Sequence, residues 1–265
     1  MGALLRHIDM GDGPPIVLLH GLYSCAEAWL PVARKLSPHL RVIAMDLRNH
    51  GRSPHLPSHT YSDMALDVLY TLHHIGVERA HLLGHSMGGR VAMMLAQLHP
   101  QCVNQLVLAD IGPQANPNSP IVRQRLQAHQ RLLGALNKLE IDTLSSFAQA
   151  EAAMEAAVPD SRLRRSMLKN LERLPSSGFR WRLNLPALMH HLPELVHGVS
   201  IEQLPNRVLL LRGELSNYVS DSDLHTFKQL CPDLQQAVLA GAGHWLHADS
   251  PHQLAAHTLR FVLGA

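Results

Sequence analysis

One short segment constrains the fold more than any other part of the chain. An apolar run from Ala80 to Leu83 is followed by GHSMGG and then by a helical pattern that continues to about residue 98. A buried strand that passes through a glycine-rich turn directly into a helix is typical of α/β proteins. Glycines two residues before and after Ser86 allow a tight turn that exposes the serine hydroxyl. The segment therefore predicts a strand–turn–helix unit with a candidate nucleophile at the turn.

The rest of the chain supplies further strands for such a sheet. Short apolar runs, each ending at a polar or glycine-rich turn, occur at 16–19, 41–45, 105–109, 207–211 and 236–240. Helical patterns lie at about 27–37, 62–76, 89–98 and 251–263. Continuous apolar runs indicate strands that are buried on both faces, as in a parallel sheet covered by helices. We therefore expect a mostly parallel, doubly wound α/β sheet.

The alternation of strands and helices stops in the middle of the chain. From about 113 to 200 the sequence is helical in pattern and is interrupted by several prolines. This predicts a helical cap insertion at 113–200, above a core formed by 1–112 and 201–265. Residues 114–200 contain eleven Arg and Lys against seven Asp and Glu. The excess is explained either by a solvated helix face or by a lid that favours an anionic leaving group, such as a coenzyme A thioester.

The overall composition excludes several classes of protein. The formal net charge of +2 offers no basis for a nucleic-acid or membrane-surface partner. Cys25, Cys102 and Cys231 lack the spacing of metal ligands, and no apolar run has the length of a signal peptide core or a membrane span. We expect a soluble, cytoplasmic protein without a metal or organic cofactor. The composition is compatible with a monomer or a homodimer.

A serine nucleophile needs a general base and donors for the oxyanion. The candidate base is His244 in GAGHW, directly after the last apolar run. His247 is the rival, but it lies beyond the glycine turn, where helix capping or a surface role is favoured. The backbone amides of Met87, after the serine, and Leu22, after the first buried strand, are the predicted oxyanion donors.

These segments resemble the α/β-hydrolase family. HG after an early strand, DLRNHGRS, GHSMGG and GAGHW match the family's motifs in order along the whole chain. More narrowly, DLRNHGRSP, DIGP at 110–113, SNYV at 216–219 and GAGHWLHA resemble the esterase/thioesterase branch of bacterial YbfF and ABHD-type proteins. The resemblance implies a serine hydrolase that cleaves carboxylic esters or acyl thioesters with small to medium acyl groups, through an acyl-enzyme and without a cofactor.

The acid of the expected triad departs from the usual pattern of the family. Family members usually carry it in the loop after the strand at 207–211, where this chain has Ser216. Asp110 ends the strand that should neighbour the nucleophile's strand, and it is the predicted acid. Glu214, Asp221 and Asp223 stay open as alternative acids. Helix capping explains at least one of Asp221 and Asp223.

Three aromatic residues adjoin the predicted catalytic loops. Tyr23, Tyr218 and Trp245 are expected to line the substrate site. The predicted partner is a small-molecule ester or thioester. Two other functions remain possible on the same fold: a C–C bond hydrolase or perhydrolase with a similar triad, and a non-catalytic binding protein.

Overall fold

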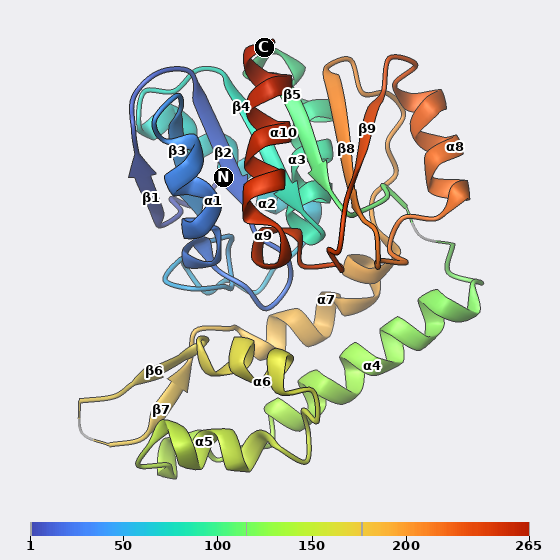
Figure 1. Ribbon diagram of the computed structural model, residues 1–265. Coiled ribbons are helices and arrows are strands. Elements are labelled where there is room, and N and C mark those ends of the chain that lie inside the picture. Colours follow the sequence, from blue (N-terminus) through green and yellow to red (C-terminus); the bar gives the residue numbers. More distant parts are fainter. Residues whose placement is uncertain (1, 115, 176, 265) are drawn as a thin grey trace.

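A seven-stranded sheet forms the centre of the molecule in the computed structural model, which describes residues 2–114, 116–175 and 177–264 (Figure 1). The strands lie in the order β1-β3-β2-β4-β5-β8-β9, and all pairs are parallel except β1 with β3. Their bounds are β1 (His7–Met10), β2 (Pro15–Leu19), β3 (Arg41–Met45), β4 (Ala80–His85), β5 (Val103–Ala109), β8 (Arg207–Gly213) and β9 (Gln235–Leu239). The predicted mostly parallel sheet is confirmed.

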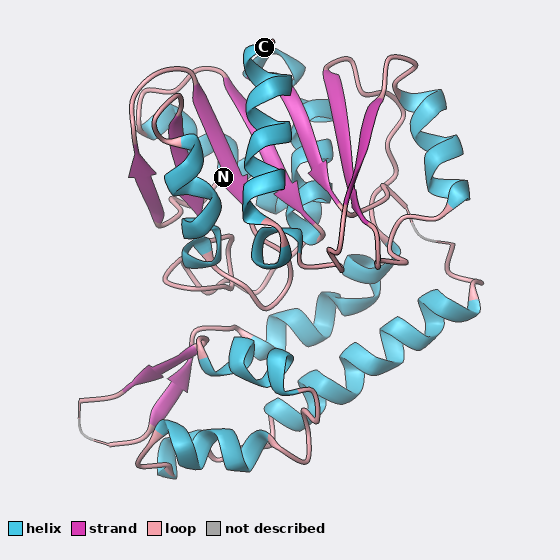
Figure 2. Ribbon diagram, viewed as in Figure 1, coloured by secondary structure: helices cyan, strands magenta, loops and turns pink. Residues whose placement is uncertain are grey.

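Helices cover both faces of this sheet, as Figure 2 shows. One face packs against α1 (Leu30–Leu36) and α10 (Pro251–Leu263), and the other against α2 (Tyr61–His74), α3 (Met87–Leu98) and α8 (Asp221–Leu230). Successive side chains of a strand point to opposite faces, so Ile16 and Leu18 join one apolar cluster while Val17 and Leu19 join the other. This double burial is why the strands are continuous apolar runs.

Strand β1 was not anticipated from the sequence. Its residues, HIDM, alternate in polarity and are only partly buried, and the strand pairs antiparallel to β3 at the edge of the sheet. An edge strand does not need apolar residues on both faces, so it leaves no continuous apolar run.

Residues 113–200, which we call the cap, lie beyond the carboxyl ends of the parallel strands (Figure 1). The helices and strands of the cap are α4 (Pro120–Leu136), η3 (Ile141–Thr143), α5 (Phe147–Met154), α6 (Ser161–Leu168), β6 (Leu171–Arg173), β7 (Phe179–Trp181) and α7 (Leu185–His197). Besides its helices the cap contains a small antiparallel sheet of β6 and β7, which the sequence pattern did not indicate. Strands of three residues are too short to give a periodic pattern.

The cap has an apolar cluster of its own. Leu133, Met154, Met167 and Leu188 are buried in it, and Tyr23 of the core joins them. Three short helices complete the fold: η1 (Ala26–Trp29), η2 (Pro100–Cys102) and α9 (Leu246–Asp249). Within the described ranges, no helix combines the length and apolar character needed to cross a bilayer.

Candidate active site

Ser86 lies at the point where β4 ends and α3 begins. Its backbone has φ 51° and ψ −118°, a strained conformation for a residue with a side chain. A Cβ atom on Gly84 would overlap the carbonyl oxygen of Gly88, and one on Gly88 would overlap the carbonyl oxygen of Leu19. The two glycines are therefore required because strand and helix backbones pack directly against each other. The result is the tight turn that the sequence predicts.

The loop after β2 lies against this turn. A Cβ atom on Gly21 would lie 3.3 Å from Cβ of Ser86 and 2.8 Å from Nδ1 of His85. This close approach brings Leu22 beside the nucleophile turn, and Leu22 and Met87 line the same cavity as Ser86. Met87 is the first residue of α3, where the backbone N–H groups have no partners within the helix. The two predicted oxyanion donors thus lie close together, Leu22 in the loop after β2 and Met87 at the start of α3.

His244 and Asp110 form a hydrogen-bonded pair beside these loops. Nδ1 of His244 lies 2.8 Å from Oδ2 of Asp110, whose side chain is 1% exposed. The backbone amide of Gly213 donates to the other carboxylate oxygen at 3.2 Å. Burial lowers the pKa of His244, and the hydrogen bond to Asp110 opposes that shift. The net lowering of the pKa favours the neutral imidazole, the state that a general base needs.

Ser216 occupies the place where the family usually carries the acid. Its hydroxyl donates to the same Oδ2 of Asp110 that His244 contacts, and it accepts from the backbone amide of Tyr218 at 3.2 Å. Because β5 and β8 are neighbours, Asp110 and Ser216 leave the sheet side by side. Ser216 therefore bonds to the carboxylate of Asp110, which in turn contacts the imidazole.

The alternative carboxylates have other partners. Glu214 accepts a hydrogen bond from the backbone amide of Gly241 at 2.7 Å. Asp223 forms a capping box with Ser220 at the start of α8, and Asp221 is the exposed first residue of that helix. Among the described residues, Asp110 is the carboxylate that contacts the His244 ring.

Two further histidines surround His244. Nε2 of His85 lies 2.7 Å from the carbonyl oxygen of His244, and the two rings are 4.7 Å apart. His247 packs against His85 and Trp29, and burial lowers its pKa to about 4. A surface or capping role was favoured for His247 from the sequence, but its ring is instead part of the packing around the site. Sequence reasoning also missed His85, although its place within GHSMG was a signal.

A cavity of about 2000 Å³ between core and cap opens onto Ser86 and His244. The predicted lining residues Tyr23, Tyr218 and Trp245 all face it. The Tyr218 ring stacks on the His244 ring, with centroids 3.4 Å apart and planes 12° apart. The Tyr23 hydroxyl lies 3.1 Å from Nδ1 of His129 on α4. The cap and core therefore build the walls together.

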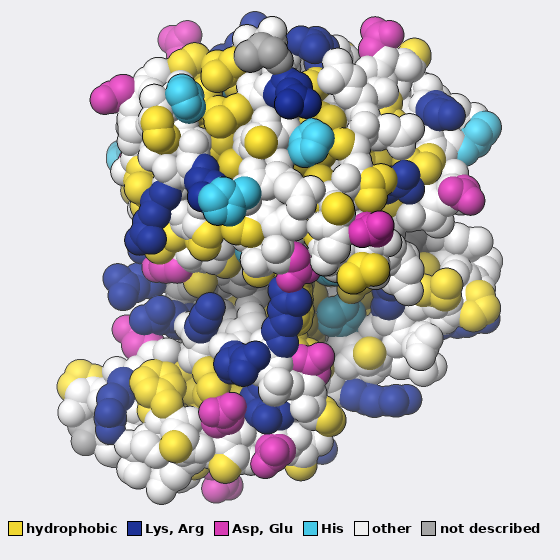
Figure 3. Space-filling view, viewed as in Figure 1, with side chains coloured by type: hydrophobic (Ala, Val, Ile, Leu, Met, Phe, Trp, Pro, Cys, Tyr) yellow, Lys and Arg dark blue, Asp and Glu magenta, His cyan; other side chains and the backbone are white. Residues whose placement is uncertain are grey.

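The lining of the cavity is richer in cations than in anions. Its carboxylates already have partners: Glu27 pairs with Arg6, Asp249 with Arg162, and Asp160 and Asp223 cap helices. Its cations are Arg90, Arg125, Arg131, Arg162, Arg165, Lys169 and Arg182. Within the described ranges, no carboxylate pairs with Arg131, Arg165 or Lys169. Figure 3 shows Lys and Arg side chains gathered where the cap faces the core.

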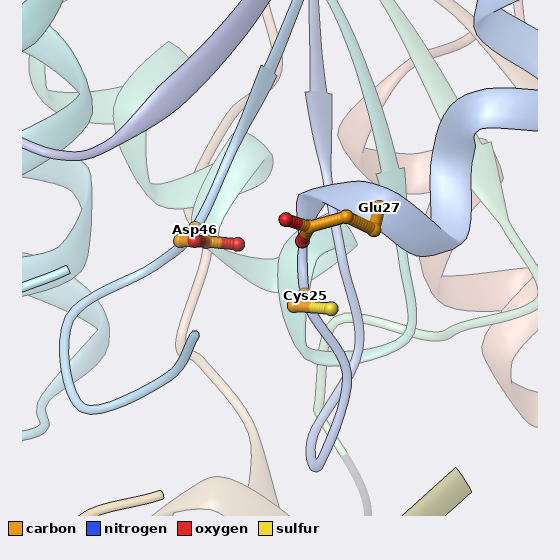
Figure 4. A group of neighbouring side chains, drawn as sticks. All are labelled: Cys25, Glu27 and Asp46. Atoms are coloured by element: carbon orange, nitrogen blue, oxygen red, sulfur yellow. The ribbon is translucent and has the colours of Figure 1, made fainter. Parts of the chain in front are cut away.

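Cys25, Glu27 and Asp46 lie close enough together to suggest a metal site (Figure 4). However, the two oxygens of Asp46 accept from the backbone amides of Ala26 (2.7 Å) and Arg52 (2.9 Å). Arg6 lies 2.8 Å from Glu27 and 3.5 Å from Asp46, and burial raises the pKa of the Cys25 thiol to about 12. The group is better explained as an anchor for the loops after β2 and β3 than as a metal site.

Comparison with known proteins identifies the family. The model of the α/β hydrolase fold matches residues 14–251. The chain belongs to the α/β hydrolase family. The predicted family and fold class are thereby confirmed, and the relatives named below, which are esterases and lipases, confirm the expectation of a hydrolytic enzyme.

Relatives of this α/β hydrolase include proteins from animals and bacteria. The chain is 34% identical to the Xenopus laevis protein named sn-1-specific diacylglycerol lipase ABHD11, over 96% of this chain and 81% of the relative. It is 31% identical to esterase YbfF of Escherichia coli, over 91% of this chain and 89% of the relative. A solved structure of a marine microorganism esterase superposes with a TM-score of 0.92 at 32% identity, covering 98% of this chain and all of the other.

Proposed function

We propose that this α/β hydrolase is a serine hydrolase of carboxylic esters or acyl thioesters, with Ser86 as nucleophile, His244 as general base and Asp110 as acid. The observation that carries the proposal is the hydrogen bond between His244 and Asp110 beside the strained turn of Ser86. All three residues follow parallel strands of one sheet, and ligands of such sheets bind outside those strand ends.

In the proposed reaction the Ser86 hydroxyl attacks the carbonyl carbon while Nε2 of His244 takes its proton. The oxyanion that forms accepts hydrogen bonds from the backbone amides of Leu22 and Met87. The imidazolium then protonates the departing alkoxide or thiolate, which leaves an acyl-enzyme. Water attacks this ester with His244 again as the base, and the acid product and free Ser86 result. Asp110 holds the imidazole tautomer and stabilises the imidazolium.

The substrate that we propose has a small to medium acyl group and an anionic leaving group, such as an acyl-CoA thioester. The supporting observation is the excess of cations in the cavity lining, with Arg131, Arg165 and Lys169 not paired to a described carboxylate. Tyr23, Tyr218 and Trp245 are the proposed aromatic contacts of the bound substrate.

The proposal is tested by labelling with a fluorophosphonate probe and by an acyl-length panel of nitrophenyl esters and acyl-CoA thioesters. We expect the probe to modify Ser86, with the label absent from Ser86→Ala. We also expect higher kcat/KM for an acyl-CoA than for the neutral ester of the same acyl group. Labelling that persists in Ser86→Ala would exclude this nucleophile, and a preference for the neutral ester would exclude the anionic leaving group.

A further inference from the structure

Two arginines of the cap reach the catalytic loops: Arg162 pairs with Asp249 and lies over the Trp245 ring, and Arg125 contacts the loop after β8. Arg125 lies on α4, and its Nη2 donates to the backbone carbonyl of Asn217 at 2.8 Å and to the side-chain oxygen of Asn217 at 2.9 Å. Its Cζ also lies 4.0 Å from the centre of the Tyr218 ring. A single guanidinium from the cap thus contacts two consecutive residues, Asn217 and Tyr218, of the loop that follows β8.

That loop contacts both members of the pair that we propose as base and acid. The Tyr218 ring, over which Arg125 lies, also stacks on the His244 ring, with the two centroids 3.4 Å apart. Ser216, two residues earlier, donates to Asp110 and accepts from the amide of Tyr218. The contacts therefore run without a break from the cap, through residues 216–218, to the imidazole and its carboxylate.

We propose that Arg125 is a positioning residue for the His244–Asp110 pair, acting through Asn217 and Tyr218, so that the base is fully oriented only while the cap is docked on the core. This inference rests on the proposed function of the same site. It makes the cap part of the machinery that orients the base, in addition to a wall of the cavity.

The side chain at 125 has the properties that such a role needs. A guanidinium is planar, so one group can stack on the Tyr218 ring and donate in its own plane to two oxygens of Asn217. A lysine ammonium is a compact charge that cannot make both contacts in this geometry. Arg123 is a natural control because it lies on the same helix, is exposed, and does not line the cavity.

The charge of Arg125 also acts on the base. The titratable groups around His244 are Asp110, Asp249, Arg125, His85, His129, His247 and Tyr218. The two carboxylates raise the pKa of His244, whereas burial and Arg125 lower it. Removing the guanidinium should therefore raise this pKa and move the acid limb of the pH–rate profile to higher pH.

The first test compares Arg125→Met with the matched control Arg123→Met on a short acetyl ester. We expect kcat of Arg125→Met to fall roughly tenfold to a hundredfold, the usual scale for a misplaced catalytic group, with KM nearly unchanged. Arg125→Lys should recover little of the lost kcat, and Arg123→Met should have the kcat of the wild type. A rise in KM with unchanged kcat would show that Arg125 only binds substrate, and would overturn the proposal.

The second test asks whether the effect passes through Tyr218. Tyr218→Phe keeps the stacked ring and should retain most activity, whereas Tyr218→Leu should lose activity as Arg125→Met does. The double variant should be little worse than Tyr218→Leu alone, because residues that act in series are not additive. Fully additive losses would contradict the proposed route.

A third measurement is independent of turnover. The His244 imidazole is titrated by NMR in the Ser86→Ala protein, with and without Arg125→Met. We expect Arg125→Met to raise the pKa of His244 and Arg123→Met to leave it unchanged. Identical titrations of Ser86→Ala alone, with Arg125→Met and with Arg123→Met would overturn the proposal. Failure of the proposed function is recognised separately, as ester hydrolysis that persists in Ser86→Ala.

Discussion

The core and the cap contribute to the site in different ways. The core places Ser86 and Asp110 directly after β4 and β5 and places Leu22 in the loop after β2, and these strands are buried on both faces. The cap places its residues on amphipathic helices that share a smaller apolar cluster. Groups at the ends of buried strands are held by backbone packing, whereas cap groups depend on side-chain contacts such as those of Arg125. We therefore expect the chemical steps to depend on the core. Selection of the substrate and orientation of His244 should depend on the cap.

The largest effect expected from this comparison is at the nucleophile. Ser86→Ala should lower kcat by a factor on the order of 10⁶, the loss seen in another serine hydrolase. Steady-state rates on a nitrophenyl ester measure this change. The cap variant Arg123→Met serves as the control and should keep normal activity. A residual rate within tenfold of the wild type would remove Ser86 from the site.

A smaller loss is expected at the acid. Asp110→Asn should retain the fold but lower kcat by roughly 10⁴, because an amide favours the wrong imidazole tautomer. Glu214→Gln and Asp223→Asn are matched controls, since their carboxylates bond to backbone amides elsewhere. If either control lost as much activity as Asp110→Asn with its thermal unfolding unchanged, the assignment of the acid would be wrong.

The pH profile of activity tests whether burial lowers the pKa of the proposed base, His244. The base works in its neutral form, so kcat/KM should fall about tenfold per pH unit below the pKa of His244. Because burial lowers that pKa, activity should persist below the usual histidine range near 6.5. His247→Gln should keep a descending acid limb, and His244→Gln should be nearly inactive. The reverse result for these two variants would show that His247 is the base.

The smallest effects are expected at the cations of the cap. Arg165→Gln and Lys169→Gln should each raise KM for an acyl-CoA by about twofold to fivefold, because exposed charge pairs contribute only modestly. Added salt should reduce the difference in KM between each variant and the wild type. The neutral nitrophenyl ester of the same acyl group is the control and should be unaffected. Equal changes for both substrates would indicate that these cations stabilise the cap and do not select the leaving group.

The sequence by itself determined the sheet, the nucleophile turn and the family. Strands buried on both faces must be apolar throughout, so five further strands and the closing helix 251–263 could be read directly. The turn at Ser86 could be predicted because the glycines on either side of the serine form a local sequence pattern, although the contact that requires Gly88 is with the end of β2. Strand β1 and the β6–β7 hairpin could not be predicted from the sequence, since short or half-exposed strands leave no continuous apolar pattern.

Only the tertiary structure decided how distant segments meet at the base. Asp110 was one of several candidate acids in the sequence, and the pairing of β5 with β8 brings it and Ser216 together, with Asp110 against His244. The stack of Arg125, Tyr218 and His244 joins residues from three separate segments. Such contacts depend on side-chain packing between segments far apart in the chain, which local periodicity does not encode.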